Sequence, residues 1–219
     1  MLNGLVPVVP TTLAIMALTF LPLVIVMGTA FTKISIVLLL VRNAMGVQQA
    51  PSGLVINSIA LVLAAFIMAP IAVGITLKIS ELDPVLNEWQ SAVDVYSIIE
   101  KDYGEYLTKF SEKKELAFFM DAAKKMWPHD LHDYVTEKNI LILLPAHVVS
   151  EITKAFEIAF LLFLPFVIID LIVSNILLAM GAMMVPPMLI SLPIKILLFV
   201  AVDGWARLLH NLVLSYAPG

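Results

Sequence analysis

Two charged residues, Asp170 and Lys195, stand well inside long apolar stretches in the last third of the chain. An ionised side chain is costly in such a stretch, so it usually faces a partner or a water-filled path. If Ile158–Met180 and Met188–Val202 fold back as a hairpin, the acid and the base come together. The carboxylate could then titrate and drive ion-coupled transport, or the pair could hold helices and subunits in register.

The register hypothesis is favoured, because carriers generally have a richer polar path than these two stretches offer. Lys33 and Asp203 are further opposite charges set in or beside apolar sequence, and the sequence alone does not assign their partners. If Asp170 and Lys195 form a buried pair, replacing Lys195 by alanine should cost about 3–5 kcal/mol, because a buried charge loses its partner.

A methionine-rich turn joins the two arms of this hairpin. Met180, Met183, Met184 and Met188 cluster there, among eleven methionines in the chain. Methionine is unbranched and adaptable, so these side chains could fill an irregular core or line a deformable seal around varied passengers. Composition by itself favours the core, and both possibilities stay open at this stage.

Residues 145–219 begin with a predicted amphipathic helix that leads into the first arm, with Pro145 at the first helical position. Glu151, Lys154 and Glu157 share its polar side at i, i+3 spacing, a pattern typical of a solvated face. Glu151 stands apart because the helix continues directly into apolar sequence. The predicted apolar stripe consists of Val148, Ile152, Ala155, Phe156 and Ala159.

No pattern in the chain is typical of an enzyme. The sequence has no cysteine, no glycine-rich phosphate loop, no G-x-S-x-G and no H-E-x-x-H. The stretch His129–Asp133 holds two histidines and two aspartates, but an exposed turn after Pro128 explains it better than a metal site. We therefore expect no catalytic activity, no cofactor and no metal.

The composition places the chain among membrane proteins. Of its 219 residues, 61% are hydrophobic and 14% are charged, and the mean hydropathy is +0.99. Soluble domains usually carry about 25% charged residues. The net charge of −4 argues against nucleic acid as a partner. The N-terminal residues lack a basic region and a small-residue cleavage site, so we expect no cleaved secretory signal.

Four apolar segments predict an all-α fold of kinked hydrophobic helices in two helical-hairpin pairs. Each segment carries a proline, three carry an embedded charge, and the last is short for a membrane span. Such helices suit a protein-lined assembly better than four independent lipid-facing spans. The prolines are Pro22, Pro70, Pro165 and Pro193.

Residues 1–80 form the first predicted pair, in which Leu13–Val41 is long enough to cross a bilayer with a kink at Pro22. We expect Gly46 to end this helix in the left-handed conformation and Pro51 to occupy the first turn of the next helix. The connecting loop follows an arginine, and no acidic residue occurs in residues 1–80, which favours the cytoplasmic side for this loop.

Residues 81–144 form a predicted soluble insertion of helical character. Residues 81–157 contain 15 of the 17 acidic residues of the chain, which suits the extracytoplasmic side. Ser111 is expected to cap a helix that runs through Trp127 and ends at Pro128. The predicted packed face of this helix consists of Leu116, Phe119, Met120, Ala123 and Trp127.

Three stretches carry a resemblance to a known family. They are Val41–Pro51, Pro145–Ile158 and Pro193–Trp205. In these stretches, and along nearly the whole chain, the sequence resembles the FliP/SctR family, the core export-apparatus proteins of bacterial type III secretion systems. The short N-terminus without a signal peptide looks more like the injectisome branch, SctR, than the flagellar branch, FliP.

The resemblance implies a core subunit of a ring-like helical export gate, the pore through which unfolded substrates cross the bacterial inner membrane. Family members assemble as a pentameric ring with FliQ/SctS-type and FliR/SctT-type subunits. An FlhB/SctU-type subunit, inner-membrane lipid and the secreted proteins are further expected partners. The helices would sit largely above the bilayer plane, with the soluble insertion on the periplasmic side. The alternative is a small ion-coupled membrane carrier that uses Asp170 and Lys195.

The resemblance also implies roles for single residues. Met183 and Met184 match the methionine gasket that constricts the closed pore of the family. Asp170 and Lys195 match a charge pair of the family, and Glu151 matches an acidic position. These three charged residues would hold helices and neighbouring subunits in register.

Two departures from the family's pattern stand in these stretches. Ala182 occupies a position where many relatives have another methionine, so we expect fewer gasket methionines per subunit. His147 and Ala159 replace an aromatic residue and a glycine that are common in the helix motif, a change that hardly affects the resemblance.

Overall fold

The structure is a computed structural model, and the residues that it describes are Ile15, Thr19, 26–47, 50–81, 89–182 and 184–217. The kink predicted at Pro22 and the gasket residue Met183 lie outside this set. None of the described residues forms a strand, which confirms the all-α prediction. The helices are α2 (Phe31–Ala44), α3 (Gly53–Glu81), α4 (Trp89–Phe110), α5 (Lys113–Met126), the 3-10 helix η1 (His129–Tyr134), α6 (Ile140–Ala179), α7 (Met188–Ala201) and α8 (Gly204–Leu214).

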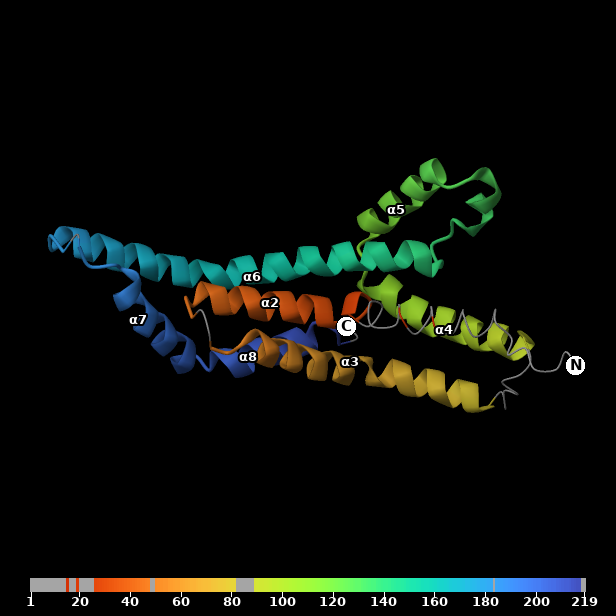
Figure 1. Cartoon of the computed structure of the whole chain (residues 1–219), viewed down its shortest axis with the longest axis horizontal. Helices are drawn as coiled ribbons and strands as arrows, with labels where there is room; N and C mark the ends of the chain where they lie inside the picture. Colours follow the sequence, from red (N-terminus) through yellow and green to blue (C-terminus); the bar gives the residue numbers. More distant parts are fainter. Residues whose placement is uncertain are drawn as a thin grey trace, which may run out of the picture.

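Helix α6 is the axis of the molecule (Figure 1). Helix α2 packs along it, α3 packs on α2, α7 folds back from one end of α6, and α4 and α5 contact the other end. At a rise of about 1.5 Å per residue, the 40 residues of α6 extend about 60 Å. A bilayer has a hydrocarbon core of about 30 Å, so this helix is far longer than a single upright span requires.

The prediction that Pro145 begins this helix is wrong. Helix α6 begins at Ile140, and the side chain of Asn139 accepts a hydrogen bond from the backbone N–H of Leu141 at 2.8 Å. An asparagine in this position satisfies one of the free N–H groups of the first turn, which is why the helix starts there. Pro145 and Pro165 both lie inside the helix.

The apolar stripe predicted along the first part of α6 is also partly wrong. Phe156 is 55% exposed, and Val148 and Ile152 are only half-buried. The buried face consists instead of small and polar residues, because α2 supplies Lys33 as a partner for Glu151 and the link after α4 supplies a backbone N–H to Ser150. Its buried members are Ala146, His147, Ser150, Glu151, Ala155 and Ala159.

The first apolar segment is interrupted just before α2. The backbone turns at residues 28–30, and the hydroxyl of Tyr103 in α4 donates a hydrogen bond to the carbonyl oxygen of Gly28 at 2.8 Å. This turn is a break that the hydropathy pattern did not predict. Ala30 is completely buried next to it, so a small side chain here allows close packing of the helices.

The connection from α2 to α3 follows the prediction in part. Gly46 has a φ of +79°, which confirms the left-handed end of α2, and the side chains of Met188 and Leu192 from α7 lie directly over it. Pro51 does not enter the next helix. The hydroxyl oxygen of Ser52 accepts a hydrogen bond from the N–H of Val55, so serine caps α3 and the proline precedes the cap.

The packed face predicted for α5 is confirmed. Its buried residue Ala123 joins Val135 and Ile142 in a small core, and α5 ends at Met126, ahead of Pro128. The half-buried side chains around that core are Leu116, Phe119, Met120 and Trp127.

The cap predicted for α5 is wrong. The residue that precedes the helix is Glu112, and it makes no side-chain cap. The hydroxyl of Ser111 donates instead to the carbonyl oxygen of Leu107 at 2.7 Å, a bond back into the end of α4. Because the link between α4 and α5 is short, the Ser111 side chain bonds to the end of α4 and does not cap the N-terminus of α5.

Helix α8 lies beyond the last predicted apolar segment, Met188–Val202, and the sequence pattern did not predict it. A bend of 59° divides α7 from α8, and Asp203 at the bend has a φ of 55°. A non-glycine residue rarely takes this left-handed conformation, so the pattern of residue types carries little signal for it. Phe199 of α7 packs against Trp205 of α8 with ring centroids 5.2 Å apart.

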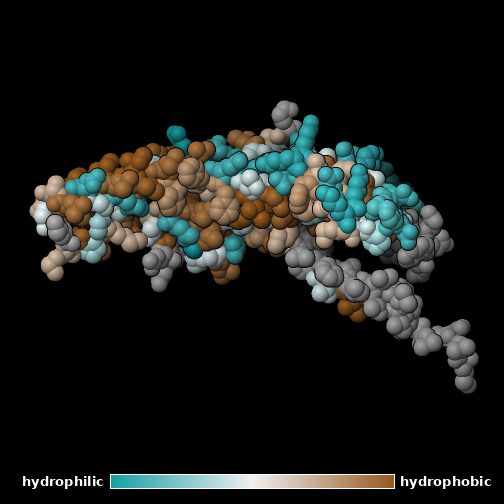
Figure 2. Space-filling view, turned by 90° about the horizontal axis from the view of Figure 1, so that it is seen from above, coloured by the Kyte–Doolittle hydropathy of each residue, from teal (hydrophilic) through white to brown (hydrophobic). Residues whose placement is uncertain are grey.

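Apolar surface covers much of the molecule. By length and composition, α3 and α6 can each cross a membrane, and α7 with α8 would add a third, bent span. Only Ile56, Ala60 and Ala64 of α3 are buried. Hydrophobic surface gathers toward the α6–α7 end and hydrophilic surface toward the α4–α5 end (Figure 2). On the face that Figure 2 shows, the chain is thus mainly apolar toward one end and mainly polar toward the other.

We predict that Gly204→Ala destabilises the chain, whereas Gly74→Ala stabilises it slightly. A Cβ at position 204 would lie 2.6 Å from the ring of Phe199, which also packs edge-on against Trp205. Position 74, inside α3, has open space, so alanine there gains helix propensity. We expect losses of about 1–3 kcal/mol and gains of about 0.5–1 kcal/mol, measured by thermal unfolding in mild detergent. Equal shifts for the two variants would contradict the packing of Phe199.

Candidate functional site

The most deeply buried ion pair in the described chain joins α2 to α6. The ammonium of Lys33 lies 3.6 Å from Oε1 of Glu151, and the two side chains are 4% and 0% exposed. The hydroxyl of Tyr216 donates a hydrogen bond to Oε2 of the same carboxylate. The Lys33 ammonium also lies 3.6 Å from the centroid of the Tyr216 ring, so the cation meets both a carboxylate and an aromatic face.

Aromatic side chains from α4 cover this charge cluster. The ring of Phe110 lies 4.8 Å from that of Tyr216, and the ring of Tyr106 lies 5.4 Å from the imidazole of His147. Burial raises the pKa of Tyr106, and the nearby Glu151 carboxylate raises it further, so the phenol stays neutral. By excluding water, this aromatic cover strengthens the attraction between the two charges beneath it.

Side chains on the polar side of α6 also form hydrogen bonds with the link between α4 and α5. The hydroxyl oxygen of Ser150 accepts a hydrogen bond from the N–H of Glu112 at 2.8 Å. The ammonium of Lys154 donates to the carbonyl oxygen of Phe110, the last residue of α4, at 2.8 Å. Lys154 therefore does not belong to a simple solvated face, as its spacing suggested, whereas Glu157 is exposed as expected.

A second charge cluster lies where α7 meets α6. The ammonium of Lys195 donates a hydrogen bond to Oδ2 of Asp170 at 2.6 Å and to the carbonyl oxygen of Ala44 at 3.2 Å. Ala44 is the last residue of α2, where free carbonyl groups favour a cation. One ammonium therefore ties three helices together.

This second pair is not fully buried. The side chain of Lys195 is 7% exposed, but that of Asp170 is 46% exposed. The expected loss of about 3–5 kcal/mol on removal of the lysine assumed full burial. In the isolated chain the loss should be smaller, because water reaches the carboxylate and screens it.

The methionines of the turn between α6 and α7 do not fill a core. Met184 is 98% exposed, Met180 75% and Met188 50%. Gly181 takes a φ of +74° and lets the chain reverse at the end of α6. The turn between α6 and α7 lies at one tip of the molecule (Figure 1), so its described methionines expose apolar side chains there.

Comparison of the whole chain with known proteins identifies its family. The FliP family matches residues 14–212. The chain belongs to the FliP family. It is 45% identical over 199 residues to Yop proteins translocation protein R of Yersinia pestis. The aligned residues cover 91% of this chain and 92% of that relative.

Further relatives extend the same similarity. The chain is 44% identical over 220 residues to probable translocation protein y4yL of Sinorhizobium fredii, with 96% of this chain and 97% of the relative covered. It is 42% identical over 205 residues to virulence protein YscR of Salmonella typhimurium, with 91% and 93% covered. These matches confirm the family resemblance drawn from the sequence motifs.

Sequence reasoning missed two members of the charge clusters. Tyr216 lies near the end of the chain, in no periodic pattern, and nothing in its surroundings indicated a buried partner. The carbonyl oxygen of Ala44 is a backbone group, which a pattern of side chains cannot reveal. Lys33 was noticed as an embedded charge, and its partner Glu151 became visible only from the packing of α2 on α6.

We predict that Lys33→Met lowers the stability of the chain by about 3–5 kcal/mol, because it leaves the Glu151 carboxylate buried without its cation. The matched control is Lys78→Met. Lys78 also pairs with a carboxylate, that of Asp102 at 2.6 Å, but its side chain is 50% exposed. We expect a loss below about 1 kcal/mol there. Thermal unfolding in mild detergent, followed by tryptophan fluorescence, compares the two, and similar losses would rule out a special role for the buried pair.

Proposed function

We propose that this chain is a core subunit of the export gate of a bacterial type III secretion apparatus. The observation that carries the proposal is the match to the FliP family over residues 14–212. Relatives along nearly the whole chain carry the names translocation protein and harpin secretion protein. The gate would pass unfolded proteins across the inner membrane, and energy for export would come from other components.

In this proposal several copies of the chain surround a pore. The apolar surface on α3, α6 and α7 supports an assembly, since it is far more extensive than a stable soluble monomer exposes. The length of α6 and the charges beside it suit a protein-lined ring better than a lipid-facing span. The expected ring is pentameric, with FliQ/SctS-type, FliR/SctT-type and FlhB/SctU-type neighbours.

The two charge clusters would serve as fixed points of the subunit. Glu151 would hold α2 on α6, while Lys195 would hold α7 between Asp170 and the end of α2. The half-exposed Asp170 has an open side on which a neighbouring subunit could donate a second hydrogen bond. An ion-coupled carrier gains no comparable support, because Lys195 is fixed to a backbone carbonyl as well as to the acid.

The proposed orientation in the membrane is supported by the distribution of charge. The water-facing α4–α5 end would lie on the periplasmic side of the inner membrane. The loop between α2 and α3, with Arg42 beside it, would lie on the opposite side. The exposed methionines at the tip of the hairpin would meet those of the other copies and close the pore, Met183 together with Met184.

The first test is the mass of the complex that the chain forms. Expressed with a FliR/SctT-type partner and extracted in mild detergent, the chain should give one discrete ring of about five copies, because its apolar faces need covering. Native mass spectrometry measures the number of copies. A chain that stays monomeric with the partner present would contradict the export-gate proposal.

The second test addresses the methionine seal. We predict that Met183→Ala with Met184→Ala increases ion leakage through the assembled complex at rest, because shorter side chains cannot fill the constriction. The control is Met126→Ala, since Met126 is 80% exposed on α5, far from the turn. Conductance of complexes in planar bilayers is the measurement. Equal leakage in the double variant, the control and the wild type would show that these methionines do not seal the pore.

A further inference from the structure

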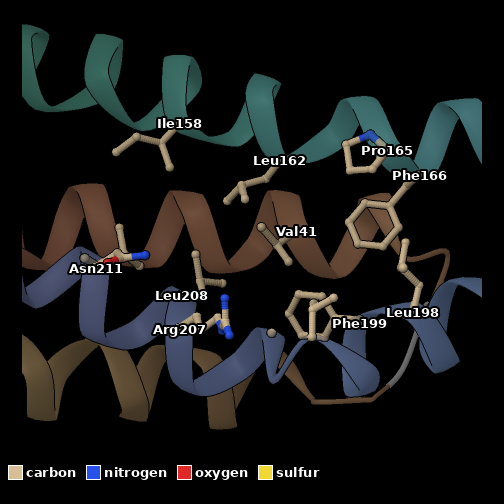
Figure 3. Close-up of a pocket in the computed structure, with 13 residues that line it drawn as sticks. Val41, Ile158, Leu162, Pro165, Phe166, Leu198, Phe199, Arg207, Leu208 and Asn211 are labelled. Carbon is tan, nitrogen blue, oxygen red and sulfur yellow. The ribbon is translucent and has the colours of Figure 1, made fainter.

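A cavity of about 550 Å³ lies apart from both charge clusters, between α6, α2, α7 and α8. Figure 3 shows its walls: α6 forms one side, Val41 of α2 lies in the middle, and α8 and the end of α7 form the other side. The apolar lining includes Ile158, Leu162, Phe166, Phe199 and Leu208.

Two polar side chains line this cavity, both on α8. Arg207 and Asn211 stand four residues apart, so they share one face of that helix. Within the described part of the chain, the guanidinium of Arg207 forms neither an ion pair nor a hydrogen bond. Asp203 contributes only its carbonyl oxygen, to the backbone N–H of Arg207 at 3.1 Å. The side chain of Asp170 on α6 is already engaged by Lys195.

Arg207 is exposed, so its guanidinium lies within reach of water at the rim of the apolar cavity, and no anion of the described chain is paired with it. A guanidinium binds phosphate through parallel hydrogen bonds and is the preferred side chain for that anion. The apolar walls of the cavity, in turn, suit a hydrocarbon chain. The combination describes a ligand with an anionic head and an apolar tail.

We propose that this cavity binds one anionic phospholipid, with an acyl chain between α6 and α8 and the phosphate at Arg207. The volume lies in the range of pockets for small ligands, about 300–1,000 Å³, which are mostly apolar with a few convergent polar groups. A protein partner would instead cover an extended surface of about 800 Å². Leu198 lines the cavity and is itself 39% exposed, so a lipid tail can reach the cavity from the surrounding apolar surface.

This proposal rests on the membrane setting of the proposed function, but its test does not require secretion. The purified protein, as chain or complex, is exchanged into mild detergent with added phosphatidylglycerol or phosphatidylcholine. Native mass spectrometry then counts the lipids retained per chain. Wild type should retain about one phosphatidylglycerol and prefer it about tenfold over phosphatidylcholine, because only the former has net negative charge.

Two variants test the binding of the anionic headgroup and of the acyl chain separately. Arg207→Gln should abolish the preference for phosphatidylglycerol and leave weak binding of both lipids. Leu162→Trp should fill the cavity and reduce retention of both lipids. Lys78→Gln, which removes an exposed cation on α3, is the control and should keep the wild-type preference. Glycerol phosphate, a headgroup without tails, should not displace the bound lipid.

Three results would overturn the proposal. They are equal retention of the two lipids by wild type, an unchanged preference in Arg207→Gln, and a loss of ring assembly in Arg207→Gln without any change in lipid retention. The last result would mean that a neighbouring chain supplies the anion. A ring that forms without retained lipid would refute this inference alone, whereas retained lipid without a ring would refute the export gate alone.

Discussion

The ion pair between Lys33 and Glu151 is the contact on which the rest of the structure depends. Both charges are removed from water here, which costs free energy of desolvation. That cost is offset only when each charge has its partner at close range and further polar groups contact the pair. The Tyr216 hydroxyl and ring face provide such contacts. Because the pair has one geometry, α2 has one register on α6, and α4 with the chain end must close over it.

The second charge cluster repeats this principle at the other end of α2. Lys195 satisfies a carbonyl group that the last turn of α2 leaves free, and the same ammonium binds Asp170. Between the two clusters, small residues keep α2 close to α6, while larger apolar side chains such as Phe156 point outward. The helices are therefore held by an apolar core together with two polar clusters, and the chain also exposes extensive apolar surface.

Part of the fold followed from local chemistry. Gly46 ended α2 as expected, since few residues take a positive φ easily, and Pro128 followed α5 as expected. The start of α6 was predicted at Pro145 because proline suits a first turn, but the capping amide of Asn139 acted earlier. The bend before α8 depends on Asp203 in a left-handed conformation, which the surrounding packing must stabilise and which hydropathy cannot show.

The sequence by itself determined the class of the protein: all-helical, rich in apolar segments with embedded charges, and a member of the FliP family. Its motifs were sufficient for that because they are local and their order along the chain is distinctive. The pairing of Asp170 with Lys195 could be expected from a hairpin, but only the tertiary structure decided which other groups meet the buried charges. Lys195 binds a carbonyl oxygen 151 residues away, and Tyr216 binds a carboxylate 65 residues away. Such contacts depend on which helix faces pack together, and that is decided by the close fit of all the helices at once and not by any one stretch of residues.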